Sequence, residues 1–400
     1  MTQGQARSLF PALSGTFGFF ENAGGSQVPH FVPDAIRDYM LSSYVQLGAG
    51  YPQSDAATKT VEEAHNFMAQ FLGAPEDGLT ILGPSTTALI QLVANAYAPI
   101  LNEGDEIVIA ESNHEANVGG WLRLEQFGAK IVWWPLDPVS FRCEPSTLVD
   151  LVNERTRVVA LPHVSNLLGQ IEDLAEVSRI AHSVGARVMA DGVALAPHRA
   201  VDVQTLGVDW YVFSAYKVYG PHIAVMFGTR EAFAGLRGPN HGFIAEGSAY
   251  KWELGGAPHE ACAGLLAVRP YFSAIAGETY GGRATILKAF AAMHEWEQPV
   301  DRLLREGAAG LSGVTVVGPA IAGENSVPTV SFTHARIGSD EIARRVNARG
   351  FGVRNGNMYA VRLLRALGIP EDPGVVRVSA VHYNTVEEAN RLLEALADAT

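Results

Sequence analysis

Lys217 lies between two apolar runs, in the stretch VFSAYKVYGP. The runs Trp210–Phe213 and Ile223–Phe227 both predict buried strands, so the lysine falls in the short turn that joins them. A lysine at such a place is either a surface ammonium whose stem packs against the protein, or an amine kept in a pocket for its chemistry. Because the turn is short, the two strands are expected to pair antiparallel.

Asp191, in ARVMADG, directly follows another apolar run and precedes Lys217 by a single predicted strand. It could simply cap the next helix, but a carboxylate at the end of a buried strand otherwise needs a partner. A cofactor that has both an aldehyde and a pyridine nitrogen uses this pair of groups. The amine forms a Schiff base, and the carboxylate keeps the ring nitrogen protonated so that the ring withdraws electrons.

Three further segments place polar groups after predicted strands or at the start of a predicted helix. His114 follows the run 105–110, where it is either a loop or cap histidine or a flat ring that covers a cofactor. Asn166 follows 156–162 and is either a turn residue or a donor to a cofactor oxygen. Ser85, Thr86 and Thr87, in GPSTTALIQ, either cap a helix or bind a phosphate at its N-terminus.

Apolar strands alternate with helical patterns over residues 20–264, which predicts a mostly parallel sheet with helices on both faces. Ligands bind at the carboxyl ends of the strands in such sheets, where the polar residues above are expected. Residues 1–19 and 265–400 are assigned to a smaller α+β domain, which contains the short strand patterns GVTVVGP, TVSFTHA, FGVRNGN and VVRVSAVHYN. One helical stretch over about 263–297 is expected to link the two domains.

Composition excludes several classes of partner. The 29 basic and 42 acidic residues give a net charge of −13, which argues against nucleic acid and anionic membranes. No run of eighteen apolar residues predicts a membrane span, and the first twenty residues do not resemble a secretion signal, so we expect a cytoplasmic protein. Cys143 and Cys262 suit two core thiols better than a disulfide framework, and no metal site is expected.

The chain resembles the class V aminotransferase family of fold type I pyridoxal phosphate enzymes, and within it the cysteine desulfurase branch. The segments that carry the resemblance are PSTTALIQLVA, HEAN, HVSNLLG, ADGVALAPHRAVDVQTLGVDWYVFSAYKVYGP, WELGGAP, GVRNGN and VRVSAVHYNT. The resemblance implies a large domain with a mostly parallel seven-stranded sheet and a smaller α+β C-terminal domain. It also implies pyridoxal 5'-phosphate as cofactor and an amino acid as the small-molecule substrate.

The resemblance assigns roles to the residues at the site. Lys217 would form the Schiff base, Asp191 would contact the ring nitrogen, His114 would stack on the ring, and Asn166 would lie near the cofactor oxygen. The phosphate ligands would be Ser85, Thr86, Thr87, Ser214, Tyr216 and the backbone N–H of Gly256. Substrate would be bound by Arg377, which would clamp the carboxylate, together with Arg354, Asn22 and Tyr359. Such enzymes are usually homodimers, and here the partner's WELGGAP loop, which contains Gly256, would complete each site.

Two departures from the family pattern bear on the reaction. The catalytic cysteine position of a desulfurase holds Tyr359, and Ala194 replaces a glutamine that would touch the cofactor. Persulfide formation therefore lacks its nucleophile, and the site is reshaped. We expect β-elimination, as a C–S lyase acting on a cysteine-like or S-conjugated amino acid. The alternatives are an aminotransferase, an epimerase or a decarboxylating or deaminating enzyme, and outside enzymes a catalytically silent binding protein.

Overall fold

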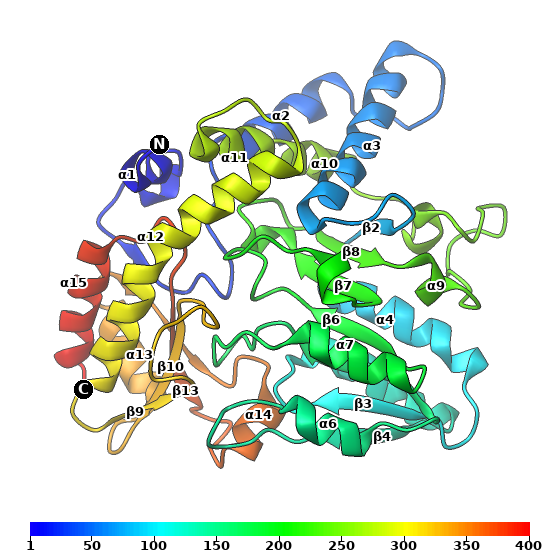
Figure 1. Cartoon of the computed structure of the whole chain (residues 1–400). Coiled ribbons are helices and arrows are strands. Elements are labelled where there is room, and N and C mark those ends of the chain that lie inside the picture. The colour runs from blue at the N-terminus through cyan, green and yellow to red at the C-terminus, as the bar shows by residue number, and fades with distance from the viewer.

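A seven-stranded sheet lies at the centre of the N-terminal two thirds of the chain (Figure 1). The computed structural model describes all 400 residues. The strand order is β2-β8-β7-β6-β5-β3-β4, and β8 is antiparallel to both of its neighbours while every other pair is parallel. The strands are β2 (Leu79–Gly83), β3 (Glu106–Ala110), β4 (Lys130–Trp134), β5 (Thr156–Pro162), β6 (Arg187–Asp191), β7 (Trp210–Ser214) and β8 (Ala224–Gly228). The predicted sheet is confirmed, including the antiparallel pairing of the strands around Lys217.

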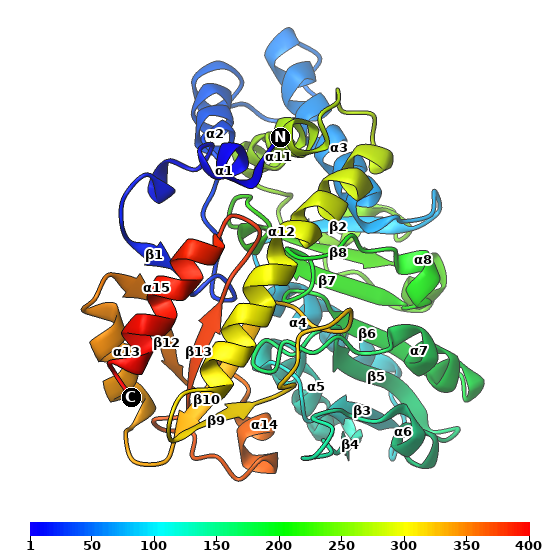
Figure 2. The ribbon, with the colours of Figure 1, turned by 60° about the vertical axis from the view of Figure 1, so that its left-hand side comes forward.

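Apolar side chains on both faces hold the sheet in the interior. In β7, Trp210 and Val212 belong to one hydrophobic cluster, whereas Tyr211 and Phe213 belong to the other. Side chains alternate across a strand, so a strand that is apolar throughout must be covered on both faces. The α4 and α5 helices supply one cover, and α3, α6, α7, α11 and α12 supply the other (Figures 1 and 2).

Capping residues in the sequence set the ends of the helices in this region. The α4 helix starts after Ser85, whose Oγ accepts a hydrogen bond from the Ala88 N–H at 3.1 Å. The α3 helix starts at Pro52 and ends at Leu72, and the next residue, Gly73, caps it in a left-handed conformation with φ of 62°. The α-helices are α1 (Gln3–Arg7), α2 (Phe31–Ser42), α3 (Pro52–Leu72), α4 (Thr86–Tyr97), α5 (Gly119–Leu122), α6 (Pro145–Leu151), α7 (Leu174–Ser183), α8 (Val203–Leu206) and α9 (Arg230–Phe233).

The antiparallel strand β8 brings two distant segments to the same edge of the sheet. Ala224 of β8 lies opposite Gly83 of β2 on one side and opposite Ser214 of β7 on the other. Two antiparallel steps make β2 run parallel to β7, so their carboxyl ends coincide. The residues that follow β2 and β7 therefore meet.

A four-stranded antiparallel sheet, of order β12-β13-β10-β9, forms a second core near the C-terminus (Figure 2). Its neighbours include a two-stranded parallel pair, in which β1 near the N-terminus joins β11. The strands are β1 (Gly18–Phe19), β9 (Val314–Val317), β10 (Thr329–His334), β11 (Phe351–Gly352), β12 (Arg354–Gly356) and β13 (Val375–Ser379). The helices are α13 (Ser339–Asn347), α14 (Val361–Ala366) and α15 (Val386–Ala397).

The prediction of one linking helix over residues 263–297 is wrong. Three helices occupy this region, namely α10 (His259–Leu266), α11 (Val268–Ala276) and α12 (Arg283–Ala309). Gly277 and Gly282 adopt positive φ values of 70° and 85°, which end α11 and precede α12. The α12 helix then continues past residue 297.

None of the helices in the structure is long and apolar enough to cross a membrane.

Six short 3₁₀ helices complete the chain. They are η1 (Pro11–Leu13), η2 (Ala98–Ile100), η3 (Glu115–Asn117), η4 (Arg123–Phe127), η5 (Ala215–Lys217) and η6 (Ala249–Trp252). Two of them position predicted site residues. Lys217 is the last residue of η5, and His114 immediately precedes η3.

Candidate active site

A cavity of about 120 Å³ opens at the carboxyl ends of the central strands. Its wall contains nine of the residues predicted from sequence, namely Ser85, Thr86, Thr87, His114, Asn166, Asp191, Ser214, Tyr216 and Lys217. Ala194, for which the sequence predicts a departure from the family pattern, also lines it. Sequence reasoning missed the remaining lining residues, Ala116, Pro162, Val164 and Val193, because small and apolar side chains carry no chemical signature.

One end of the cavity is built for an anion. Thr86 Oγ1 and Ser214 Oγ lie 2.7 Å apart, which joins the start of α4 to the end of β7. Ser85 and Thr87 are exposed beside them. The N-terminus of the twelve-residue α4 adds backbone N–H groups and the positive end of a helix dipole. These groups can hold a phosphate.

Asp191 ends β6 with its side chain buried. Its Oδ1 accepts one hydrogen bond, from the Val193 N–H at 3.0 Å. Burial raises the pKa of this carboxyl to about 6, against the opposing effects of the hydrogen bond and of the Lys217 charge. A cationic ring nitrogen would supply the partner that a buried carboxylate needs.

Lys217 is 9% exposed and faces the same cavity. Burial, and next the charge of Arg377, lower the pKa of its amine to about 8. Its Nζ lies 5.8 Å from the centre of the Tyr216 ring. About a tenth of the amine is therefore neutral at pH 7, and the neutral amine is the form that attacks an aldehyde or accepts a proton.

His114 combines both of the roles considered for it from sequence. Its Nδ1 accepts a hydrogen bond from the Ala116 N–H at 3.0 Å, so it caps η3. The ring also lines the cavity, and burial lowers its pKa to about 4, with Lys217 and Arg377 adding to the effect. The ring is thus neutral, which suits a flat cover over an aromatic ligand better than an acid.

Asn166 and Arg377 form the side of the site that would face a substrate. Arg377 Nη1 donates to the Asn166 carbonyl oxygen at 3.2 Å, and Asn166 Nδ2 donates to the Met358 carbonyl oxygen at 2.8 Å. Both side chains are buried, yet Asn166 Oδ1 and Arg377 Nε have no partner. Asn166 lines the cavity, whereas Arg377 does not line it and is connected to it through Asn166. An unsatisfied buried polar atom at a cavity wall indicates a place for a polar ligand.

Other predicted residues lie outside the cavity. Asn22 is buried, and its Nδ2 donates to the carbonyl oxygens of Phe19 and Ser379 while its Oδ1 accepts from Tyr383. Its side chain is used within the fold, so the geometry does not support a role in binding substrate. Gly256 does not line the cavity of its own chain. Arg354 is half-exposed and lies 3.6 Å from Glu21.

Tyr359 is held at the surface by its loop. Its carbonyl oxygen accepts from the Glu115 N–H at 2.8 Å, and its ring lies 5.3 Å from the His114 ring. Arg362 pairs with Glu115 and covers the Trp133 ring at 4.7 Å. These contacts, which sequence reasoning missed, fasten the loop to the segment that carries His114.

Neither cysteine reaches the cavity. Cys143 and Cys262 are free but buried, and burial raises the pKa of each thiol to about 12. A thiol in this state is not a nucleophile.

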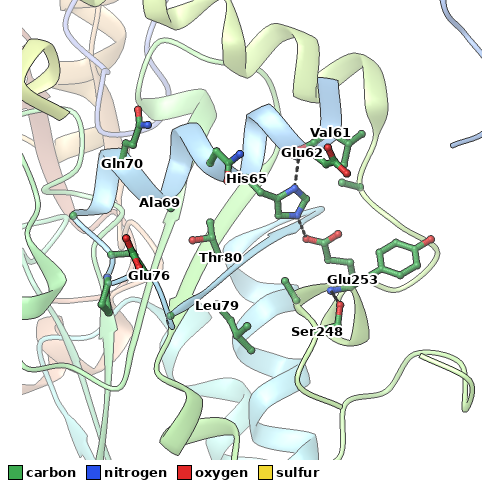
Figure 3. Close-up of a pocket in the computed structure, with 18 of the residues that line it drawn as sticks. Val61, Glu62, His65, Ala69, Gln70, Glu76, Leu79, Thr80, Ser248 and Glu253 are labelled. Carbon is green, nitrogen blue, oxygen red and sulfur yellow. Dashed lines mark hydrogen bonds and ion pairs between the residues drawn. The ribbon is translucent and has the colours of Figure 1, made fainter. Parts of the chain in front are cut away.

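A larger cavity, of about 1100 Å³, lies between α3, the start of β2 and the loop around η6 (Figure 3). His65 Nδ1 donates to Val61 O at 2.8 Å, and His65 Nε2 lies 2.6 Å from Glu253 Oε1. The same Glu253 oxygen accepts from the Leu82 N–H at 2.7 Å. Glu253 thus ties the WELGGAP loop to the strand that leads into Ser85 and Thr86.

Comparison with known proteins defines the class. The family described as aminotransferase class-V matches residues 18–392. The chain is 37% identical to the aminotransferase-like protein FGM3 of Gibberella zeae, over 98% of this chain and 96% of that one. It is 30% identical to a cysteine desulfurase of Dickeya dadantii, over 98% and 95%. The cysteine desulfurase CsdA of Escherichia coli superimposes with a TM-score of 0.85 at 28% identity, over 100% and 98%.

The chain therefore belongs to the class-V aminotransferase family. It is a fold type I enzyme that depends on pyridoxal 5'-phosphate, as the sequence predicted. The site fits this cofactor. The Thr86–Ser214 end suits its phosphate, buried Asp191 suits a protonated ring nitrogen, and the Lys217 amine suits its aldehyde.

Proposed function

We propose that the enzyme is a C–S lyase that cleaves cysteine-like or S-conjugated amino acids by β-elimination. The observation that carries the proposal is the pairing of a buried lysine amine of lowered pKa with a cavity from which both thiols are absent. The bound cofactor would withdraw electrons from Cα. Elimination then needs one base on the enzyme and no enzyme nucleophile.

Arg377 and Lys217 have different roles in the proposed reaction. Arg377 binds the substrate carboxylate, as suits a buried guanidinium with an unpartnered Nε. Lys217 would hold the cofactor at its aldehyde, and its amine, when free, would accept the Cα proton of the substrate. The Cβ–S bond breaks and the sulfur leaves as a thiolate, which takes up a proton. The remaining aminoacrylate hydrolyses to pyruvate and ammonia.

Persulfide formation is not part of this proposal. The resemblance aligns Tyr359 with the catalytic cysteine of the desulfurases, and Cys143 and Cys262 are enclosed in the protein core. The resemblance also aligns Ala194 with a glutamine, and the smaller side chain would leave room in the cavity wall for a substrate with a group attached to sulfur.

The test is to incubate the purified enzyme with S-methyl- and S-benzylcysteine and to measure pyruvate and free thiol. Both products should appear in equal amounts, and Lys217→Ala should abolish them. Lys130→Ala is the control, because this lysine pairs with Glu106 and lies outside the cavity. Absence of both products with every S-substituted cysteine tried would rule out the lyase.

Transamination is the second candidate, because the relative at 37% identity is described as aminotransferase-like. It uses the same binding residues, and Lys217 would move the proton from Cα to the cofactor instead of releasing a group from Cβ. Release of a keto acid without thiol, together with dependence on an added keto acid, would establish this alternative.

We also propose a homodimer that shares its active sites. Large apolar side chains are exposed on α2, on the segment after it, and on the loop 243–254, with Leu41 at 80% and Phe243 at 86%. Such exposure over neighbouring segments is typical of an interface. The WELGGAP loop would carry Gly256 into the partner's site.

The two unpaired thiols favour a reducing compartment, and we propose that the protein is located in the cytoplasm.

A further inference from the structure

One carboxylate of the chain lies between the two arginines of the substrate side. Arg354 on β12 and Arg377 on β13 are directly opposite each other in the strand register. Glu21 Oε1 lies 3.3 Å from Arg377 Nη2 and 3.6 Å from Arg354 Nη1. Arg377 is buried, whereas the side chains of Glu21 and Arg354 are 36% and 48% exposed. The outer two side chains can therefore move while Arg377 stays.

This group adjoins the catalytic amine. The charges of both arginines lower the pKa of Lys217, and the charge of Glu21 raises it. Arg377 also donates to the carbonyl oxygen of Asn166, whose side chain lines the cavity. Glu21 thus occupies one side of the guanidinium that would receive the substrate carboxylate.

The backbone of Glu21 is fixed, so that only its side chain can leave. Residue 21 forms a bridge with Ser379, and the Ala23 N–H donates to Ser379 Oγ at 2.8 Å. The side chain folds back over Gly24, where an added Cβ would lie 2.0 Å from Glu21 Oε1. Glycine at this position permits the observed placement of the carboxylate.

We propose that Glu21 is a specificity-determining residue that limits the site to substrates with one acid group. A substrate carboxylate replaces the Glu21 carboxylate on Arg377, and the Glu21 side chain remains with Arg354. Two guanidinium groups and one carboxylate leave a single positive charge, which one substrate carboxylate balances. A second acid group on the substrate would have to compete with Glu21 for Arg354. This inference rests on Arg377 as the carboxylate ligand of the proposed function.

The test measures the binding of propionate and succinate to the holoenzyme by calorimetry, without any reaction. In Glu21→Gln both ligands should bind more tightly. The preference for succinate over propionate should rise about tenfold, because the second acid group of succinate can then form a charge-assisted hydrogen bond with Arg354. Glu63→Gln is the matched control, because Glu63 is equally exposed and pairs with Arg269, away from the site. It should leave both affinities unchanged.

Gly24→Ala provides a second variant that keeps the charge but displaces the Glu21 carboxylate, and it should raise the preference for succinate by a smaller factor. If Glu21→Gln does not fold, this variant decides the matter. An unchanged preference in a folded variant would overturn the proposal. A changed preference in an enzyme that releases no thiol would retain the role of Glu21 and reject the lyase reaction.

Discussion

Asp191 and Lys217 reach the same cavity from neighbouring parallel strands. Asp191 is the last residue of β6 and lies opposite Val212 of β7, and Lys217 follows the end of β7 within one 3₁₀ turn. Each is buried, and each modifies the ionisation of the other through its charge. The sheet thereby presents an acid and an amine to one cavity.

Replacing Asp191 by Asn should lower kcat by about 100-fold or more, because a preorganised charge is lost where the ring nitrogen is held. The dissociation constant of the cofactor, measured by absorbance during dialysis, should rise. Asp209→Asn is the control, since this buried aspartate precedes β7 at its other end and pairs with Arg187. It should reduce thermal stability and spare activity per folded molecule. Equal kcat in Asp191→Asn and wild type would contradict the assignment.

Cofactor incorporation into the cofactor-free protein should depend on pH through Lys217. The pKa of the amine is lowered to about 8, so the neutral, reactive fraction rises about tenfold per pH unit below 8 and levels off above it. Absorbance after mixing gives the rate. The unfolded chain binds more protons between pH 8 and 10.5, so the stability of the cofactor-free protein should also increase over this range. Lys217→Ala should form no covalent adduct on borohydride reduction, and a rate independent of pH would refute the argument.

Neither cysteine should matter for catalysis. Cys143→Ala and Cys262→Ala each remove a buried side chain, so each should lower the free energy of unfolding by about 1 kcal/mol. Because both thiols lie in the core and outside the cavity, kcat should be unchanged within twofold at temperatures where the variants stay folded. Loss of activity in a folded variant would instead show that one thiol takes part in the reaction.

Arg362 should keep the Tyr359 loop in place. Arg362→Ala removes the ion pair with Glu115 and the contact with Trp133, so limited proteolysis near residue 359 should become faster. KM should rise more than kcat falls, because the loop adjoins Asn166 and His114 without touching the amine. Arg365 lies on the same helix as Arg362, and Arg365→Ala removes an exposed pair with Glu371, so it should change neither quantity. If both variants behave alike, the loop is held by other contacts.

Shared active sites can be tested by mixing two inactive variants. Lys217→Ala lacks the amine, and Gly256→Asp would place a negative charge beside the partner's phosphate. A heterodimer carries one site with both defects and one with none, so a mixed preparation should recover about a quarter of wild-type activity. Each variant alone should remain inactive, and an inactive mixture that contains heterodimers would exclude the sharing of this loop.

The sequence predicted most of the cavity because its polar residues follow strands. Apolar runs indicate the strands, and parallel strands place their last residues at one edge of the sheet. The locations of Asp191, His114 and Asn166 could therefore be predicted without knowledge of side-chain packing. The position of Glu21 was not predictable in this way. Its bridge to Ser379 joins residues 358 apart in sequence, and only the pairing of the N-terminal segment with the second core reveals it. The contacts of Asn22 were not predictable for the same reason, because its partners Ser379 and Tyr383 come from that distant segment.

The extent of the linking helices was also beyond sequence reasoning. Residues 277–282 contain three glycines in a region of helical composition, and their positive φ values at 277 and 282 depend on how α11 packs against α12. Helical periodicity alone gives no reason to place a break there rather than at residue 297.

The turn that carries Lys217 is braced on both sides. Ala215 N–H donates to Ile223 O, Gly220 N–H donates to Ala215 O, and the Ser26 hydroxyl donates to Tyr216 O while accepting from the Tyr219 N–H. The backbone is anchored, so the amine travels only by rotation of its four-carbon stem, on a timescale of about picoseconds to nanoseconds. Proton transfer at this residue should therefore be insensitive to solvent viscosity. If added glycerol slows turnover, the step that it slows is substrate entry or product release.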